Sequence, residues 1–128
     1  MTLLLDTHVL LWAVAEPGAL SSRARLLLTD GANTLLVSSA SAWEVATKHR
    51  LGRLPMAEVL LASFSEHLRA LRAVELPMSV RHALTAGAFP SPHRDPFDRM
   101  LAAQALHEGV PLVSRDEAFA AFPIETVW

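Results

Sequence analysis

Residues 2–6, TLLLD, form a short apolar run that ends in a carboxylate, and a helical pattern over residues 8–16 follows directly. A run of leucines bounded by polar residues is typical of a buried strand. Residues 34–38, TLLVS, repeat this arrangement, because a helical stretch to about Leu51 comes directly after them. Buried strands that alternate with helices are the units of a parallel sheet. The two stretches therefore predict an α/β fold.

The rest of the chain continues this alternation without a repeat or a linker. We expect helices over residues 22–30 (capped at Ser21-Ser22), 39–51 (capped by Ser39 or Ser41), 56–73, 79–88 and 95–109, and a helical turn over 116–121. We expect strands over residues 74–76, 112–114 and 125–128, and an irregular loop over 89–94. This order predicts a single domain, residues 1–128, in which a short parallel β-sheet is flanked by helices as an α/β/α sandwich.

The composition excludes several classes of protein. Of the 128 residues, 52% are hydrophobic and 19% are charged, which excludes intrinsic disorder. The absence of cysteine excludes disulfide scaffolds, thiolate zinc sites and cysteine nucleophiles, and it fits a reducing, cytoplasmic compartment. The apolar run over residues 9–15 is far shorter than the ~20 residues of a membrane-spanning helix, so we expect no membrane contact. A net charge of −2 gives no general affinity for nucleic acid, so any such site must be local.

Acidic residues stand at the junctions between the expected elements. Four of the 13 Asp and Glu residues do so: Asp6, Glu44, Asp98 and Asp116. Because the carboxyl ends of parallel strands lie at one edge of a sheet, these acids can converge on one point. Asp6 and Asp116 also have a simpler explanation as caps of the helical segments that follow them, and the sequence leaves that explanation open.

Glu44 has a simpler explanation too, because Lys48 follows it by four residues, in the order that favours a surface ion pair. A helical step of about 100° per residue, however, places Glu44 on the face of Ala40, Thr47 and Leu51, at the edge of the apolar stripe. This position favours a site residue over a surface pair.

Two acids compete in the helix that follows the Pro-rich loop. Asp95 precedes Pro96, and proline favours the first helical position, so Asp95 is the natural N-cap. Asp98 lies one turn into the helix, on a face shared with Leu101 and Ala105 that should be buried. A carboxylate on a buried face needs a partner, because its desolvation is unfavourable. Asp98 is therefore the better candidate for a metal ligand.

Crowded carboxylates repel one another unless a cation compensates them. Mg²⁺ and Mn²⁺ take oxygen ligands, and they support phosphodiester hydrolysis by polarising the phosphoryl oxygen and orienting water. Basic residues flank the acids and could bind a phosphate backbone: Arg94, Arg99 and Arg115, with Lys48 near Glu44. The residues alone favour a metal-dependent hydrolase of nucleic acid, with an ordinary ion pair as the alternative for each arginine.

The segments around the acids resemble a known family. They are residues 3–12 (LLLDTHVLLW), 38–45 (SSASAWEV), 93–104 (HRDPFDRMLAAQ) and 112–116 (LVSRD). These segments look like the four acidic motifs of PIN-domain ribonucleases. Their order, their spacing and the total length are similar to those of the VapC toxins of bacterial type II toxin–antitoxin pairs, and the resemblance covers nearly the whole chain.

This resemblance implies a metal-dependent endoribonuclease toxin that cleaves RNA phosphodiester bonds with Mg²⁺ (or Mn²⁺). The implied catalytic and metal-binding residues are Asp6, Glu44, Asp98 and Asp116. Hydroxyl groups at Thr7 and Ser114 are implied to support the metal site, and Asp95 is an additional acid found in a subset of the family.

The resemblance also implies protein partners. The family usually forms homodimers and is inhibited by a VapB antitoxin whose tail lies in the active-site groove. We therefore expect RNA, a VapB-type antitoxin and a second copy of the chain as partners, assembled in toxin–antitoxin hetero-oligomers. The apolar stretches over residues 9–14 and 59–71 are candidates for these protein contacts.

Two other functions remain open. Asp6 could be the covalent nucleophile of a phosphohydrolase, although the haloacid dehalogenase pattern has a second Asp where this chain has His8. The chain could also be a non-catalytic RNA- or protein-binding module of the same fold. The six histidines have no metal-ligand spacing, and only His93 is placed to touch a substrate. The tryptophans are expected in the core or at a partner surface: Trp12, Trp43 and Trp128.

Overall fold

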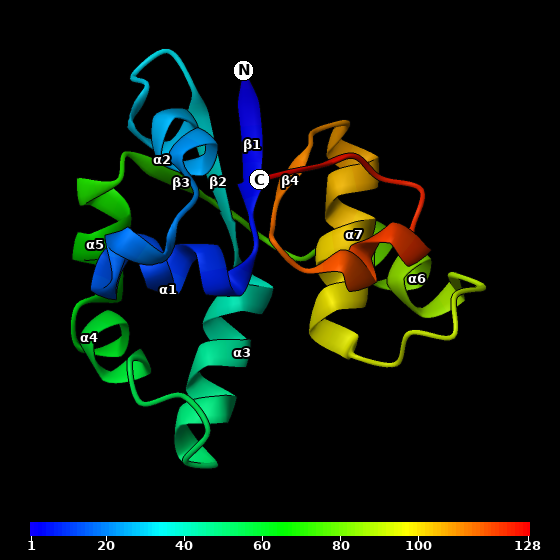
Figure 1. The fold of residues 1–128 in the computed structure, drawn as a ribbon. Helices are drawn as coiled ribbons and strands as arrows, with labels where there is room; N and C mark the ends of the chain where they lie inside the picture. Colours follow the sequence, from blue (N-terminus) through cyan, green and yellow to red (C-terminus); the bar gives the residue numbers. More distant parts are fainter.

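Five parallel strands form one sheet in the order β3-β2-β1-β4-β5 in the computed structural model, which describes residues 1–128 (Figure 1). The strands are β1 (Thr2–Leu5), β2 (Thr34–Ser38), β3 (Ala73–Leu76), β4 (Leu112–Val113) and β5 (Thr126–Val127). The chain builds outward from β1 to β2 and β3, and then adds β4 and β5 on the other side of β1. The direction in which strands are added reverses between β1 and β4. In open parallel sheets, ligands bind at the carboxyl ends of the strands beside such a reversal.

Helices cover both faces of this sheet, which confirms the expected α/β/α sandwich. They are α1 (Thr7–Ala15), α2 (Ser22–Thr29), α3 (Ser39–Arg50), α4 (Ala57–Ala62), α5 (Phe64–Ala70), α6 (Val80–Ala88) and α7 (Pro96–Glu108), with two 3₁₀ helices, η1 (Pro17–Ala19) and η2 (Glu117–Ala121). Figure 1 shows α1, α2, α4 and α5 on one side of the sheet and α6 and α7 on the other.

The central strand, β1, contacts the helical layers on both faces of the sheet. Successive side chains of a strand point to opposite faces of the sheet. Leu3 and Leu5 join a hydrophobic cluster with residues of α1, α2 and α4, whereas Leu4 joins a second cluster with residues of α7. All three side chains are fully buried, so the leucine run of residues 2–6 contributes to two cores at once.

The single helix expected over residues 56–73 was wrong. The structure has two helices there, α4 and α5, because the backbone at Ser63 leaves the helical region, with φ −149° and ψ 49°. The change of direction lets Leu60 of α4 reach the core next to α1, while α5 packs beside β3.

The expected N-cap of α3 was also wrong by a residue. Ser38, rather than Ser39 or Ser41, caps the helix, and its Oγ accepts a hydrogen bond from the backbone N–H of Ala40 at 3.0 Å. Strand β2 therefore passes into α3 without a loop, which brings the first turns of α3 close to the carboxyl edge of the sheet.

The apolar stretch over residues 9–14 is core in its first half only. Val9, Leu10 and Leu11 are fully buried and not available to a partner, which corrects the expectation for these residues, whereas Trp12, Ala13 and Val14 are partly exposed. The stretch over residues 59–71 is mixed, because Val59 is half-exposed and Leu60 is buried. None of the helices has both the length and the apolar composition needed to span a lipid bilayer.

Candidate active site

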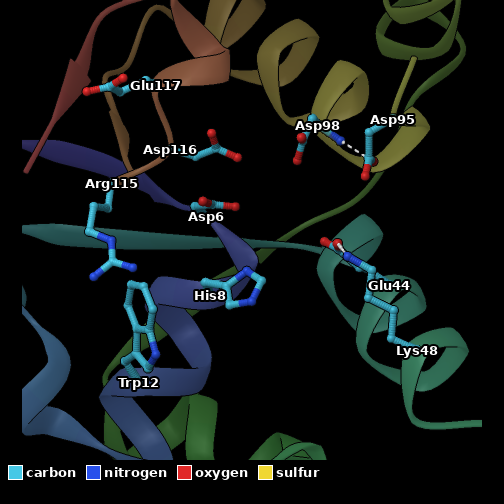
Figure 2. A pocket seen from close by; sticks show the side chains of 10 residues that line it. All are labelled: Asp6, His8, Trp12, Glu44, Lys48, Asp95, Asp98, Arg115, Asp116 and Glu117. Atoms are coloured by element: carbon cyan, nitrogen blue, oxygen red, sulfur yellow. Dashed lines mark hydrogen bonds and ion pairs between the residues drawn. The ribbon is translucent and has the colours of Figure 1, made fainter. Parts of the chain in front are cut away.

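A cavity of about 560 Å³ opens where β1 and β4 end (Figure 2). The four acids expected to converge all line it: Asp6, Glu44, Asp98 and Asp116. They come from the end of β1, the second turn of α3, the first turn of α7 and the segment after β4. The structure therefore confirms the expected convergence at the carboxyl edge of the sheet, beside the reversal of strand order.

Asp6 lies at the centre of the cavity and is 6% exposed. One carboxylate oxygen accepts from the backbone N–H of Thr7 at 2.7 Å, so Asp6 does cap α1. The other oxygen accepts from Oγ of Ser114 at 2.7 Å. Burial raises the pKa of Asp6 above its usual value, and this effect exceeds the opposing effect of the two hydrogen bonds. Asp6 is thus both a helix cap and a buried acid in the cavity.

Glu44 is 3% exposed and forms an ion pair with Lys48. The pair that we considered less favoured is therefore present, but the carboxylate is buried as its place on the apolar stripe predicted. Burial lowers the pKa of Lys48, yet the hydrogen bond and the charge of Glu44 exceed that effect, so the pKa of Lys48 is raised. Oε1 of Glu44 is buried and has no hydrogen-bond partner. One oxygen of this buried carboxylate therefore has no donor or cation to compensate its desolvation.

Asp95 caps α7 as the sequence predicts, and both Asp95 and Asp98 line the cavity. Oδ1 of Asp95 accepts from the backbone N–H groups of Phe97 at 2.8 Å and Asp98 at 3.1 Å. The side chain of Asp98 is 14% exposed and points into the cavity, where Oδ2 contacts Nε2 of His93 at 2.8 Å (Figure 2). Burial, together with the charges of Asp95, Asp6 and Glu44, raises the pKa of Asp98 to about 6.

Asp116 and Ser114 connect β4 to the cavity. Asp116 is exposed and caps η2 by accepting from the backbone N–H of Ala118. It also lines the cavity, so its position is compatible with both a cap and a site residue. Ser114 donates to Asp6 and accepts from the backbone N–H of Asp116 at 3.0 Å, so its hydroxyl links two of the acids. The hydroxyl of Thr7 instead donates to Oγ of Ser41 at 2.9 Å, and only its backbone contacts Asp6.

The three arginines proposed to bind a phosphate backbone have different environments. Arg115 lines the cavity. Arg94 is exposed and does not line it. Arg99 is turned away, and its guanidinium donates to backbone carbonyls of Ala86, Gly87, Phe89, Ser91 and His93. The expectation of a substrate contact by Arg99 was therefore wrong, because its guanidinium is bound to carbonyl groups at the end of α6 and in the loop that follows.

Three residues of the cavity were not predicted from the sequence: His8, Trp12 and Glu117. His8 and Trp12, both in α1, line the side of the cavity opposite Glu44 and Lys48 (Figure 2). Their spacing of four residues, directly after Asp6, places both on the face of α1 that adjoins that carboxylate. This spacing is the signal that would have identified them.

The structure has no group of three or more His, Asp or Glu side chains arranged to hold a metal ion. The carboxylates are instead turned toward hydrogen-bond donors, such as Ser114 for Asp6, His93 for Asp98 and Lys48 for Glu44. The donor set nevertheless fits Mg²⁺ or Mn²⁺, because it consists of carboxylate oxygens around a water-accessible hollow. The unpartnered oxygen of Glu44 and the raised pKa of Asp98 both indicate acids that lack enough positive charge nearby.

The sequence and the fold match known proteins. The PIN domain family model matches residues 3–125. Ribonuclease VapC22 of Mycobacterium tuberculosis (strain ATCC 25618 / H37Rv) is 35% identical over 132 residues, which cover 99% of this chain and 98% of the relative.

Two solved structures show the same fold at low sequence identity. The crystal structure of VapBC2 from Rickettsia felis bound to a DNA fragment from their promoter matches with a TM-score of 0.72 and 18% identity, over 100% of this chain and 99% of that one. The crystal structure of FitAcB from Neisseria gonorrhoeae matches with a TM-score of 0.64 and 21% identity, over 98% and 96% of the two chains. With the family model and the full-length relative, these likenesses establish that the chain belongs to the PIN domain family.

Proposed function

We propose that the protein is a metal-dependent endoribonuclease that hydrolyses RNA phosphodiester bonds in the acidic cavity. The observation that carries the proposal is the gathering of Asp6, Glu44, Asp98 and Asp116 around one cavity at the reversal of the sheet. The full-length relative named Ribonuclease VapC22 supports RNA as the substrate. The burial of Asp6 and Glu44 beside two further acids also argues against a non-catalytic module, since a binding module does not need buried, mutually repelling carboxylates.

The acids would share the binding of Mg²⁺ or Mn²⁺. When bound, such an ion supplies Lewis-acid polarisation of the phosphate and lowers the pKa of a water nucleophile. The residues around the acids keep them in place: Ser114 holds Asp6, His93 holds Asp98, and Lys48 holds Glu44. Thr7 links α1 to α3, because its hydroxyl donates to Oγ of Ser41, and Asp95 caps α7.

We also propose that the enzyme is a toxin neutralised by a VapB-type antitoxin. The relative is named VapC, and the two similar structures are those of VapBC2 and FitAcB. The excess of acids in the cavity favours a basic segment of the antitoxin as its inhibitory part, because opposite charges attract across an interface. A homodimer, and hetero-oligomers of toxin with antitoxin, are the assemblies proposed with it, in the cytoplasm.

The test is RNA cleavage by purified protein with and without Mg²⁺, with the 5′ ends of the products sequenced. Asp6→Asn keeps one oxygen as the acceptor for the backbone N–H of Thr7, and its NH2 group then faces Oγ of Ser114. The substitution removes the charge, so we expect a folded protein that no longer cuts RNA. Glu66→Gln removes an exposed carboxylate on α5, away from the cavity, and is the matched control. Cleavage by Asp6→Asn at the rate of the wild type would refute the mechanism. A wild type that neither binds Mg²⁺ or Mn²⁺ by calorimetry nor cuts RNA would favour the non-catalytic module.

A further inference from the structure

The cavity has two chemically different sides. Glu44, Lys48 and Asp95 line one side, and His8, Trp12, Arg115 and Glu117 line the other, with Asp6, Asp98 and Asp116 between them (Figure 2). The second side therefore holds two aromatic rings and a cation beside a single carboxylate. Trp12 is the only hydrophobic residue that lines the cavity. An apolar ring at the edge of an acidic site is not needed to bind a metal ion, so it calls for a separate explanation.

The position of Trp12 is set by its neighbours. Its ring lies 5.7 Å from that of Trp128 and 5.6 Å from that of His8, measured between centroids, and it packs against the core cluster under α1. These contacts leave Trp12 partly exposed toward the cavity. The ring is packed on its inner side, and the guanidinium of Arg115 lies over it, so ring and guanidinium together form a preformed surface for stacking.

Arg115 is the cavity's unpaired cation. Lys48, the other Lys or Arg of the lining, is held by Glu44, whereas none of the three salt bridges of the structure involves Arg115. Its side chain is exposed, and the guanidinium carbon lies 5.0 Å from the centroid of the Trp12 ring (Figure 2). A cation–π contact at an exposed site is weak, so the guanidinium keeps its donors available for an anion.

Trp43 shows that exposure of a tryptophan is not the decisive feature. Trp43 is 54% exposed, yet it packs edge-on against Phe97 at 4.8 Å and does not line the cavity. Only Trp12 combines an accessible ring with a free cation and a neighbouring group of acids. This combination of an aromatic face and a cation is how proteins bind unpaired nucleotides, because bases stack on the ring and the cation contacts the phosphate.

We propose that Trp12 and Arg115 form a subsite for one unpaired nucleotide of RNA next to the scissile bond. The base stacks on the Trp12–Arg115 pair, and the guanidinium binds the phosphate of that nucleotide. The subsite requires single-stranded RNA, because a base within a duplex is stacked between its neighbours. It tolerates different bases, because stacking depends on the π-face that all bases share. This inference rests on the proposed function, since it locates part of the RNA in the same cavity.

The test compares two single strands of equal length: oligoadenylate, and a ribose-phosphate strand without bases. Binding is measured by fluorescence anisotropy in Mg²⁺ with Asp98→Asn as the parent, so that the strand is not cut. Trp12→Leu should weaken the binding of oligoadenylate by about tenfold and leave the baseless strand unchanged, and Trp12→Phe should restore the preference. Arg115→Gln should weaken the binding of both strands.

Two variants serve as matched controls outside the cavity. Trp43→Leu removes an exposed tryptophan, and Arg23→Gln removes an exposed arginine of α2, and neither should change either affinity. Because the two strands are compared on the same protein, a folding defect in Trp12→Leu would weaken both and would overturn the proposal, as would no change in either. If this surface binds a protein segment rather than RNA, Trp12→Leu should change the affinity for neither strand. Failure of the wild type to cut RNA would instead overturn the proposed function.

Discussion

Nε2 of His93 lies 2.8 Å from Oδ2 of Asp98, five residues further along the chain. The contact joins the loop before α7 to the acidic cavity. Arg99, the next residue after Asp98, fixes the same loop from the other side by donating to the carbonyl of His93 at 2.8 Å. The position of one acid of the cavity thus depends on a loop that two neighbouring side chains hold together.

The first prediction concerns the stability of Asp98→Asn in metal-free protein. The pKa of Asp98 rises from 3.8 to about 6 on folding, so its ionised form destabilises the folded state by about 2–3 kcal/mol. That cost is nearly absent at pH 4, grows as the pH rises from about 4 to 6, and is fully present above 6. The substituted amide is neutral and still offers an oxygen to His93, so the variant should be more stable than the wild type at pH 7.5 and equally stable at pH 4. Urea unfolding in EDTA at both pH values measures this, with Glu66→Gln expected to show no such difference.

The second prediction concerns Arg99. Its guanidinium donates to carbonyls at the end of α6 and in the loop that follows. Arg99→Ala leaves several of these carbonyls unpaired and should lower the free energy of unfolding by about 3 kcal/mol. Arg99→Lys should recover less than half of this, because one ammonium cannot match the fork of a guanidinium. Arg94→Ala, at an exposed position nearby, should stay within about 0.5 kcal/mol of the wild type. A loss of equal size at both positions would contradict the assignment.

The third prediction concerns Ser114. Its hydroxyl donates to Asp6 and lowers the pKa of that carboxyl, while burial raises it. Ser114→Ala should therefore raise the pKa of Asp6 further and reduce stability at pH 7.5 by about 1–2 kcal/mol. The loss should shrink as the pH falls, because protonated Asp6 no longer requires the donor. Ser114→Thr keeps the hydroxyl and should restore stability. Chemical denaturation across the pH range, with the carboxyl titration followed by NMR, separates these outcomes.

The fourth prediction concerns the Glu44–Lys48 pair. Lys48→Met leaves a buried carboxylate without its cation and should destabilise the protein by about 3–5 kcal/mol. The double variant Glu44→Gln/Lys48→Met removes both charges and should be clearly less destabilised than the single variant. Additive effects of the two substitutions, measured by urea unfolding, would show that the pair is not coupled.

The fifth prediction concerns the metal ion. A ligand that binds only the folded state stabilises it, by about 1.4 kcal/mol at a tenfold excess over its dissociation constant. Mg²⁺ or Mn²⁺ should therefore raise the unfolding temperature of the wild type, and EDTA should reverse the rise. The effect should be much smaller in Asp6→Asn. A rise of the same size in both proteins would place the ion outside the cavity.

The sequence predicted the sheet and the convergence of the acids well, because both follow from short-range patterns. The leucine run of residues 2–6 is apolar on both sides of its strand, so helices must cover both faces of the sheet. A parallel sheet brings the carboxyl ends of its strands to one edge, and the acids follow those ends. The assignment of Asp95 as the cap of α7 was also correct, since proline at the first helical position determines it, whereas Asp95 and Asp98 both line the cavity.

The errors lie where long-range contacts decide. Arg99 is adjacent in sequence to an acid of the cavity, yet its guanidinium is directed to a loop that tertiary structure folds over it. The break at Ser63 has no proline or glycine to announce it, and it follows from the different packing of α4 and α5. Trp12 was expected in the core or at a partner surface, and only the position of Arg115, near the other end of the chain, shows that it borders the cavity.

The amino-acid sequence by itself determined the layered α/β architecture, the chain positions of the acids and the caps that start most helices, because each depends on residues within a few positions of one another. The tertiary structure alone decided which polar group each acid contacts, which arginine reaches the cavity and which ring borders it. Such choices depend on distances between segments that are remote in the chain, and these distances are set only when the strands pair and the two hydrophobic cores close around them.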